Sequence, residues 1–355
     1  MHEFAALPQE DRTDAVIVAA REKGMHPVIV EKDFWVCWTL DYLFEESAFR
    51  SSLAFKGGTS LSKGFNLIER FSEDIDLIFD WRLLGYGLEE PWEKRSNTKQ
   101  DAFVRQINGE AATFLRTELM PEMQRHLEEQ HIVGATLQID ERDPQTLRFF
   151  YPQSFSDNSI LQEIRLETGA LAAWTPTTVA HIIPYIAEEF PGAFARPRTS
   201  VLTVSPERTF WEKATILHKE AFRTNGRFPS RYSRHYYDLY KLAHSDVKKQ
   251  ALSDTRLLRS VVDFKATFWR SNAARYDLCA PGTLRLVPPE DSMPLIKKDY
   301  AAMRNMIFGD APDFDELMSE ISQLESEIND LAPLSNIRKM PGDNSRRLGR
   351  SKSLR

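Results

Sequence analysis

The segment that decides the fold, residues 55–80, reads FKGGTSLSKGFNLIERFSEDIDLIFD. It opens on the glycine pair Gly57-Gly58, continues through hydroxyl side chains and a lysine, and ends where aspartates alternate with apolar residues. Glycine lets the backbone approach a ligand closely, and a polar–apolar alternation is typical of a half-buried strand. The segment therefore predicts a tight turn, a short helix and a strand, an order that suggests a phosphate-binding turn beside a metal site.

Asp74 and Asp76 are the candidate metal ligands of this strand. Side chains alternate between the faces of a strand, so the two carboxylates point the same way, about 7 Å apart at the backbone. Neighbouring carboxylates repel each other unless a cation lies between them, and Mg²⁺, or Mn²⁺ in its place, binds carboxylate and phosphate oxygens. On these two residues alone an acidic strand end in water is the simpler interpretation, and the upstream turn is what favours a metal site.

The upstream turn supplies the candidate nucleotide-binding residues Gly57, Gly58, Thr59, Ser60 and Lys63. Either hydroxyl residue is expected to cap a helix whose first backbone N–H groups attract phosphate, and the lysine one helical turn later is expected to reach the same anion. The spacing misses the P-loop pattern at two positions, which argues against a Walker-type ATPase.

The composition of the 355-residue chain, 42% hydrophobic and 28% charged, is ordinary for a soluble globular protein of about two domains. Cys37 and Cys279 are far apart and form no CxxC pattern, which supports neither a disulfide framework nor a thiolate zinc site. No apolar run is long enough to span a bilayer, and the first residues lack the layout of a signal peptide. We therefore expect a cytoplasmic protein without membrane contact.

The net charge of −6 is unevenly distributed along the chain. Residues 336–355 hold seven Lys or Arg and one Asp, so that this tail is +6 and the rest of the chain is −12. Contact between the acidic body and nucleic acid would have to come from local basic patches. We expect the tail itself to be disordered.

The periodicity of apolar residues predicts an α/β (α+β) fold in two parts. Residues 1–195 are expected to form a mixed sheet with flanking helices, and residues 196–335 a mainly helical domain. Prolines between residues 175 and 198 break up a helical segment there and mark the boundary. Expected helices include residues 9–23, 28–47, 101–130 and 313–331, and expected strands include residues 135–140, 146–151 and 160–168.

Two of these helices carry patterns with a simple interpretation. Glu31 and Asp33 open the second helix, where the helix dipole favours acids, so we interpret them as electrostatic caps. The helix at residues 313–331 has apolar residues at alternating spacings of four and three, as in a coiled-coil seam. Because the seam is short, we expect it to dock on its own domain rather than to form a dimer.

A glycine–serine turn, a helix and then Asp-x-Asp on the next strand resemble the DNA polymerase beta-like nucleotidyltransferase superfamily. The amino-acid sequence here, FKGGTSLSKGF followed by RFSEDIDL, resembles more specifically the AbiEii-like nucleotidyltransferases, the toxins of type IV toxin–antitoxin systems. The resemblance covers most of residues 28–245. It extends to three further pieces: VEKDFW at residues 30–35, FWEKA at residues 210–214 and RHYYDLYKL at residues 234–242.

The resemblance implies a Mg²⁺-dependent toxin that transfers NMP from an NTP to an acceptor hydroxyl and releases pyrophosphate. RNA, in particular tRNA ends, is the implied acceptor, and a separately encoded antitoxin is the implied partner. Lys213 would contact the triphosphate, and Asp238 would complete a catalytic set with Asp74 and Asp76. Physically, a lysine suits phosphate, and an aspartate opposite it could orient that lysine or help to deprotonate the acceptor.

Members of the superfamily commonly add a third carboxylate from a neighbouring strand. Glu163 and Glu167 share one face of a predicted strand with Arg165, because apolar residues occupy the positions between them. We predict Glu167 as the third metal ligand and keep Glu163 as the second choice. A solvated face on which Arg165 pairs with the acids is an equally good interpretation.

The segment from residue 222 to residue 235 is the best candidate for an RNA-binding patch. It interleaves arginines, which track a phosphate backbone, with aromatic side chains, which stack on unpaired bases. The arginines are Arg223, Arg227, Arg231 and Arg234. A flexible basic loop that complements the acidic body is an equally good interpretation.

Two other functions remain open on the sequence alone. The enzyme could transfer a nucleotide to a small molecule or to a protein, and the basic loop argues mildly for RNA instead. The chain could also be a nucleotide-binding regulator that no longer catalyses, although all the matching acidic positions are present.

Overall fold

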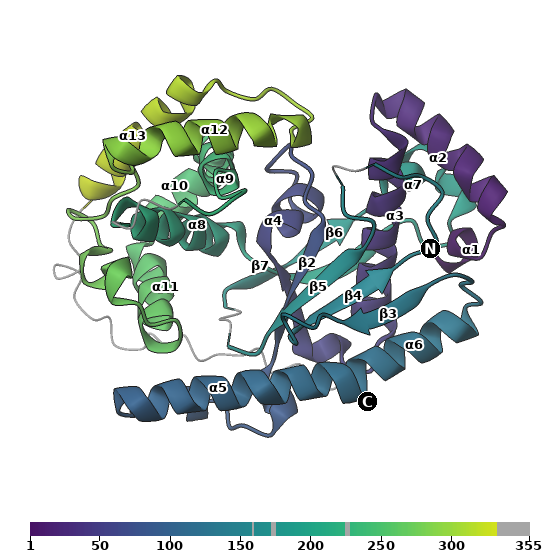
Figure 1. The fold of residues 1–355 in the computed structure, drawn as a ribbon, viewed down its shortest axis with the longest axis horizontal. Helices are drawn as coiled ribbons and strands as arrows, with labels where there is room; N and C mark the ends of the chain where they lie inside the picture. Colours follow the sequence, from purple (N-terminus) through teal and green to yellow (C-terminus); the bar gives the residue numbers. More distant parts are fainter. Residues whose placement is uncertain (158–159, 172–174, 224–227, 332–355) are drawn as a thin grey trace.

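The computed structural model describes residues 1–157, 160–171, 175–223 and 228–331. Its centre is a seven-stranded sheet with the strand order β3-β4-β5-β2-β1-β7-β6 (Figure 1). The strands are β1 (Leu53–Lys56), β2 (Asp74–Phe79), β3 (Thr136–Ile139), β4 (Thr146–Phe150), β5 (Ile164–Gly169), β6 (Thr177–Ile182) and β7 (Thr199–Val204). Within the described ranges, no helix is both long and apolar enough to cross a membrane.

The sheet is mixed, as expected from the sequence. β2 runs antiparallel to β1 and parallel to β5, and β1 runs parallel to β7. The outer pairs β3–β4, β4–β5 and β6–β7 are antiparallel. The register places Asp76 of β2 between Lys56 of β1 and Glu167 of β5, so that these three residues form one row across the sheet. The predicted α/β (α+β) class is confirmed.

Helices surround the sheet on several sides, and their positions can be followed in Figure 1. The α-helices are α1 (His2–Ala5), α2 (Gln9–Lys23), α3 (Pro27–Asp41), α4 (Gly57–Thr59), α5 (Asn97–Phe114), α6 (Met120–Glu129), α7 (Tyr185–Glu189), α8 (Pro206–Ala221), α9 (Arg234–Ala243), α10 (Asp246–Ser253), α11 (Thr255–Phe268), α12 (Met293–Met303) and α13 (Phe314–Asn329). Single π-helical turns extend three of them, at Tyr42–Glu46, Ser60–Gly64 and Leu115–Leu119.

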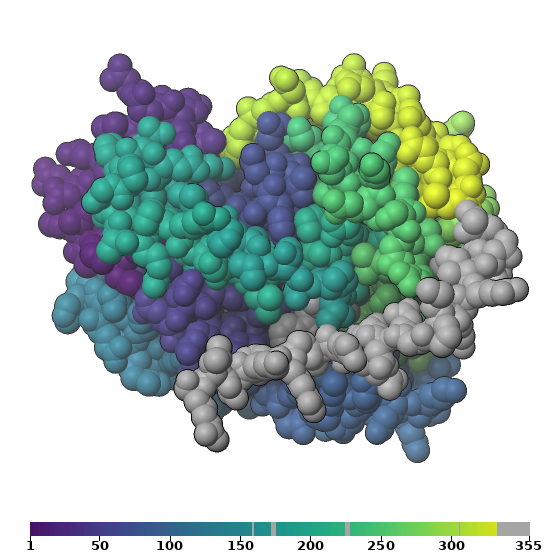
Figure 2. All heavy atoms as spheres, turned by 180° about the vertical axis from the view of Figure 1, so that it is seen from behind, coloured from purple at the N-terminus to yellow at the C-terminus, as the bar shows by residue number. Residues whose placement is uncertain are grey.

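The N-terminal helices α1–α3 and the helices α8–α13 lie at opposite ends of the molecule (Figures 1 and 2). One apolar core joins α3 to the sheet, and a second lies among the helices after residue 206. The seam of α13 is buried in the second core, so the prediction that it docks on its own chain is confirmed. Its buried residues are Leu317, Ile321, Leu324 and Ile328.

The segment between residues 175 and 198 differs from the sequence prediction. It was expected to be a broken helix, but it forms β6 and the single helical turn of α7. β6 pairs with β7 along its whole length, because both segments are rich in β-branched residues, which favour strands. The sheet therefore continues past the boundary expected near residue 195, and β7 belongs to it.

The charged residues near the start of α3 do not act as caps, in contrast to the prediction. The helix begins at Pro27 and has no acid in its first turn. Glu31, Lys32 and Asp33 are each no more than 5% exposed. Lys32 Nζ lies 2.9 Å from Glu73 Oε2, and Glu31 accepts a hydrogen bond from the backbone of Ser154. Lys32 and Glu31 thus tie α3 to the segment before β2 and to the segment after β4.

Candidate active site

Gly57 forms the turn that leads from β1 toward the site. Its φ of +85° lies in the left-handed region, which favours glycine. A Cβ on this residue would lie 1.8 Å from Asp76 Oδ2, so a side chain here would collide with a predicted metal ligand. The first glycine of the pair is therefore required both by the backbone conformation and by the close approach of Asp76.

Asp74, Asp76 and Glu167 line one cavity together with the two glycines of this turn. Asp76 and Glu167 are direct partners on the parallel strands β2 and β5. Burial, with the charges of Glu73 and Asp76, raises the pKa of Asp74. Burial and the charges of Asp74 and Asp76 raise the pKa of Glu167 to about 7. The site thus concentrates negative charge, which Arg165 and Arg234 offset only in part at Glu167.

Glu163, the second choice for the third carboxylate, does not line this cavity. Arg148 holds its carboxylate through two hydrogen bonds, and Arg165 Nη1 lies 3.3 Å from its other oxygen. The prediction of an arginine-paired strand face describes Glu163 fully and Glu167 in part, because Arg165 Nε also lies 3.7 Å from Glu167 Oε1. Glu167 in addition stands beside Asp76.

The opposite wall of the cavity comes from α8 and α9 and is basic. Lys213 and Arg234 line it, with Arg70 from the segment before β2. Ser205 begins α8 as its cap and accepts a hydrogen bond from the backbone N–H of Arg208. The predicted Lys213 is thus brought to the cavity that the acidic residues line.

Asp238 lies behind this basic wall and is fully buried. Arg70 donates to both of its oxygens, at 2.6 and 2.9 Å, and Lys213 Nζ lies 2.8 Å from Oδ2. Burial alone would raise the pKa of Asp238, but Arg70 and Lys213 hold it well below its ordinary value. Asp238 does not line the cavity, so this geometry favours a role in orienting Lys213 over contact with the acceptor.

His235 is a further partner of Lys213. Burial and the charge of Lys213 hold the pKa of His235 far below its ordinary value, so its ring is neutral. Its Nδ1 lies 3.3 Å from Lys213 Nζ and can accept a hydrogen bond from the ammonium. Burial lowers the pKa of Lys213 while Asp238 opposes that effect. The lysine is therefore held in place by both Asp238 and His235.

Three of the predicted phosphate ligands point elsewhere. Thr59 Oγ1 donates to the backbone oxygen of Asp74 at 2.5 Å, and Ser60 Oγ donates to the backbone oxygen of Gly57 at 2.8 Å. Lys63 Nζ lies 2.8 Å from Asp33 Oδ1 on α3. None of the three lines the cavity, because the helical turn after the glycines directs them toward the core and α3.

The predicted RNA-binding arginines are divided among different partners. Arg223 binds Glu220, and Arg231 Nη2 lies 2.8 Å from Glu73 Oε1. Arg234 lines the basic wall of the cavity. Arg227 lies outside the described residues. Among the described residues of this segment, the arginines therefore do not form a continuous basic surface.

Several residues of the site were not singled out from the sequence. Lys56, the last residue of β1, lines three neighbouring cavities and stands opposite Asp76 in the sheet. Arg70 and Ser72 flank Gly58 closely. The position of Lys56, directly before the glycine pair, was the signal that could have identified it. Arg70 carried no comparable signal, because its partner Asp238 is far away in the sequence.

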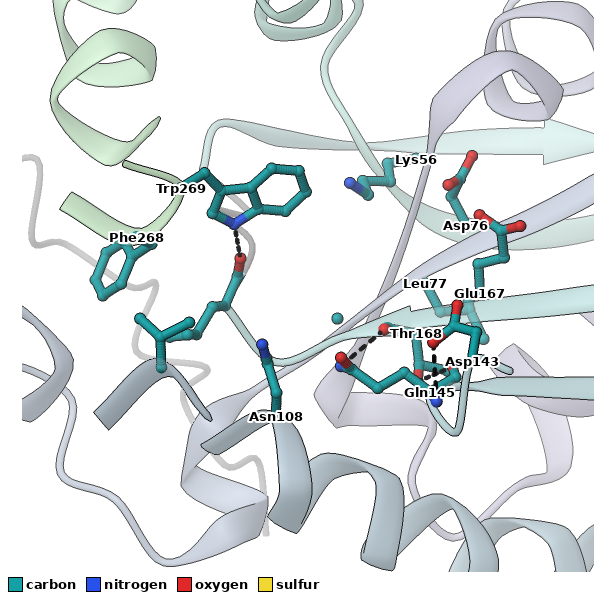
Figure 3. A pocket seen from close by; sticks show the side chains of 13 residues that line it. Lys56, Asp76, Leu77, Asn108, Asp143, Gln145, Glu167, Thr168, Phe268 and Trp269 are labelled. Carbon is teal, nitrogen blue, oxygen red and sulfur yellow. Dashed lines mark hydrogen bonds between the residues drawn. The ribbon is translucent and has the colours of Figure 1, made fainter. Parts of the chain in front are cut away.

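A second cavity adjoins the first at Asp76 and Glu167, which line both. Trp269 and Asn108 lie across this second cavity from the two acids, and Lys56 extends between them (Figure 3). The side chain of Trp269 is 57% exposed, and its indole N–H donates to the backbone oxygen of Leu171 at 3.4 Å. The acids thus separate a basic compartment from one with an exposed aromatic ring.

Comparisons with known proteins identify a family and a related fold. The family model described as "Nucleotidyl transferase AbiEii toxin, Type IV TA system" matches residues 38–320. Among solved structures, MenT4, a nucleotidyltransferase toxin from Mycobacterium tuberculosis H37Rv, has a TM-score of 0.50 and 16% identity over 89% of this chain and 90% of its own. At this identity the likeness concerns the fold. No curated protein matches the sequence.

The family match covers well over half of the chain and includes the glycine turn, the acidic strand and both helices of the basic wall. The fold of the solved toxin agrees with it over nearly the whole length of both chains. The protein therefore belongs to the AbiEii family of nucleotidyltransferase toxins of type IV toxin–antitoxin systems.

Proposed function

We propose that this toxin transfers a nucleoside monophosphate from an NTP to a hydroxyl group of RNA, with tRNA ends as the acceptor and Mg²⁺ as the metal. One observation carries the proposal: Asp74, Asp76 and Glu167 face Lys213 across a single cavity that also includes the glycine turn. Acids that can hold a cation, opposite a cation that can hold phosphate, suit a nucleoside triphosphate with its metal.

The three carboxylates fit a divalent cation. Burial and mutual repulsion raise the pKa values of Asp74 and Glu167, which is the cost of placing these charges together without a counterion. Asp74, Asp76 and Glu167 would hold the ion. Mg²⁺ bound there would neutralise charge on the phosphate and activate the acceptor hydroxyl.

The basic wall is suited to the β- and γ-phosphates. Lys213 and Arg234 present positive charge to the cavity, and the glycine turn lets the backbone approach an anion closely. Asp238 and His235 fix the ammonium of Lys213, which reduces the entropy lost when it binds phosphate. On this assignment pyrophosphate leaves toward α8 and α9.

The acceptor would then enter from the Trp269 side. In an in-line displacement the attacking oxygen approaches opposite the leaving group, and the second cavity lies on the other side of Asp76 and Glu167. An exposed indole is a stacking surface for an unpaired base, and the amides of Asn108 and Gln145 in the same cavity can bond its edges. This chemistry favours an RNA end over a protein side chain as the acceptor. The argument for RNA therefore rests on this cavity and no longer on the arginines of residues 222–235, which have different partners.

A third cavity, between α8 and α11, is suited to the base of the NTP. It shares Lys56 and Glu212 with the phosphate cavity, and Tyr232, Phe264 and Tyr276 are among its lining residues. Apolar and aromatic walls of this kind commonly hold a nucleobase. The three cavities together provide places for triphosphate, base and acceptor around Lys56.

The test is to incubate the purified protein with Mg²⁺, total RNA and each labelled NTP in turn, beside the Asp76→Ala variant. We expect one NTP to label a discrete RNA fraction, and we expect the variant to label none. Equal labelling by the variant, or no labelled RNA with any NTP, would show that the proposed reaction is wrong. Label found in protein or in small molecules would support the alternative acceptors instead.

The acceptor assignment is tested separately with Trp269→Ala. Trp269 lines both the acceptor cavity and the cavity assigned to the base, so this variant should raise the KM for RNA. Asn108→Ala, at a residue that lines only the acceptor cavity of the three, should raise the KM for RNA while the KM for NTP stays unchanged. Trp92→Ala, which removes another partly exposed tryptophan that packs on Phe264 and Phe268, is the matched control. Growth arrest on expression, relieved by the cognate antitoxin and absent in Asp76→Ala, tests toxicity.

A further inference from the structure

The imidazole of His126 on α6 is buried, and one of its nitrogens has no hydrogen-bond partner among the described residues. The residue is 8% exposed, and its Nε2 is buried without a hydrogen-bond partner among the described residues. The rings of Tyr42 and Trp38 pack against it, with centroids at 4.5 and 5.7 Å. A buried polar atom without a partner destabilises the folded state, so a ligand for this nitrogen is to be expected.

Two further ligand groups surround this nitrogen. His2 Nε2 on α1 lies 2.6 Å from Glu46 Oε1, and Glu46 Oε2 lies 3.8 Å from His126 Nε2. One ligand atom from each of the three residues lies within 4.8 Å of the others. An atom placed between the three groups could contact all of them after small side-chain shifts.

We propose that His2, Glu46 and His126 form a binding site for a divalent transition metal of the zinc type. Two imidazoles and one carboxylate are a characteristic zinc donor set, and a partly exposed glutamate leaves a fourth position for water. Mg²⁺ and Ca²⁺ prefer all-oxygen sites, so the imidazoles distinguish this site from the acidic one around Asp76.

An ion pair between His2 and Glu46 is the competing explanation. It accounts for the 2.6 Å contact, but it leaves His126 Nε2 without a partner. Arg196 Nη2 lies 3.2 Å from Glu46 Oε1, so it steadies one oxygen while the other faces His126. A metal satisfies all three groups, whereas the ion pair satisfies two.

The position of the site indicates a structural role. Its ligands come from α1, from the π-helical turn after α3 and from α6, three segments that are far apart in the sequence. None of the three lines the cavities around Asp76. A metal here would close long loops and hold α1 against the core, which stabilises the folded state. The proposal does not depend on the proposed transferase reaction.

Co²⁺ is the probe for the test, because its visible absorption distinguishes tetrahedral imidazole–carboxylate coordination from octahedral coordination by oxygens. Full-length protein without an affinity tag is stripped with a chelator and titrated with Co²⁺ and then with Zn²⁺. We expect one tetrahedral Co²⁺ per chain, displacement of it by Zn²⁺, and a Zn²⁺-dependent rise in the unfolding temperature. Asp76→Ala should keep all three signals, because the catalytic acids are not involved.

His126→Ala and Glu46→Gln should each weaken Zn²⁺ binding by at least roughly tenfold, as even changes outside the ligand shell do. Glu46 is partly exposed, so Glu46→Gln keeps the test valid if His126→Ala fails to fold. His131→Ala, at an exposed histidine close by in the sequence, should bind as the natural chain does. Absence of the tetrahedral spectrum, or its persistence in both ligand variants, would overturn the proposal.

Discussion

The protein treats two groups of acidic residues in opposite ways. Asp238 is fully buried between Arg70 and Lys213, and its pKa lies well below its ordinary value. Asp74 and Glu167 stand together with Asp76, and their pKa values are raised. The fold stabilises the ionised form of Asp238, whereas it destabilises the ionised forms of Asp74 and Glu167. Asp74, Asp76 and Glu167 are called the acidic row below. A raised pKa within a cluster of acids therefore indicates a site that can bind an added cation. A lowered pKa indicates an acid that is already paired and holds its neighbours in position.

The contrast separates residues that contact ligands from residues that hold them. Lys213 connects the two groups, because it faces the acidic row across the cavity and is bound to Asp238 from behind. Substitutions in the acidic row should therefore lower the transfer rate and leave the free energy of unfolding unchanged or higher. Substitution of Asp238 should mainly lower the free energy of unfolding.

The largest expected effect is on activity, from Asp76→Asn. Loss of a metal ligand removes several kcal/mol of transition-state stabilisation, so the rate of nucleotide transfer should fall by about a thousandfold or more. The free energy of unfolding should stay the same or rise, because a repelling charge is removed. Rates from labelled NTP and urea unfolding measure the two quantities.

Asp80→Asn is the control for this variant, because Asp80 directly follows the same strand and binds Arg82 instead. It should retain the natural rate. If Asp76→Asn kept a transfer rate within tenfold of the natural rate, the claim that the acidic row binds the catalytic metal would be wrong.

The next largest effect is on stability, from Asp238→Asn. It leaves Arg70 and Lys213 buried without their counterion, which should lower the free energy of unfolding by about 3–5 kcal/mol. Glu69→Gln, which removes a partly exposed ion pair with Lys241, should lower it by about 1 kcal/mol or less. Similar losses in the two variants would mean that Asp238 does not support the basic wall.

A smaller effect is expected on the pH dependence of stability, through Glu167. Its pKa is about 7 in the folded protein and about 4.3 when unfolded, so between these values only the folded state retains the proton. The free energy of unfolding should therefore fall as the pH rises through this window. The side chain is 43% exposed, so screening by water makes the fall smaller than the shift alone implies.

Urea unfolding at several pH values, with EDTA, should show this fall in the natural chain and a flatter profile in Glu167→Gln. Addition of Mg²⁺ should reduce the fall, because a bound cation favours the ionised carboxylates. Stability that rises with pH across the window, or identical profiles in the two chains, would contradict the raised pKa.

The smallest effect is expected from Glu163→Gln. Its carboxylate is bound by Arg148 and Arg165 and does not line the cavity, so transfer activity should stay close to natural. If Glu163→Gln lowered the transfer rate as much as Glu167→Gln does, Glu163 would have to be counted among the metal ligands. Steady-state rates for both variants decide between them.

Local patterns predicted the strand that carries Asp74 and Asp76 and the face on which they lie. The alternation around Asp74 and Asp76 places both on one face of β2, as expected. The basic side was predicted only in part, because Lys63 and Lys213 are equally suitable as residue types. Packing of the π-helical turn against α3 takes Lys63 to Asp33, and packing of α8 takes Lys213 to the cavity. The residues next to either lysine in the sequence do not indicate which of the two reaches the cavity.

The sequence by itself determined the mixed α/β class, the glycine turn, the acidic strand and the family. These follow from short-range rules, namely the side-chain period of a strand and the conformational freedom of glycine. Only the tertiary structure decided that Glu167 rather than Glu163 stands beside Asp76, that Asp238 is held by Arg70, and that β7 joins the sheet. Each of these depends on partners brought together from distant parts of the chain, where register and burial, not local pattern, select the contact.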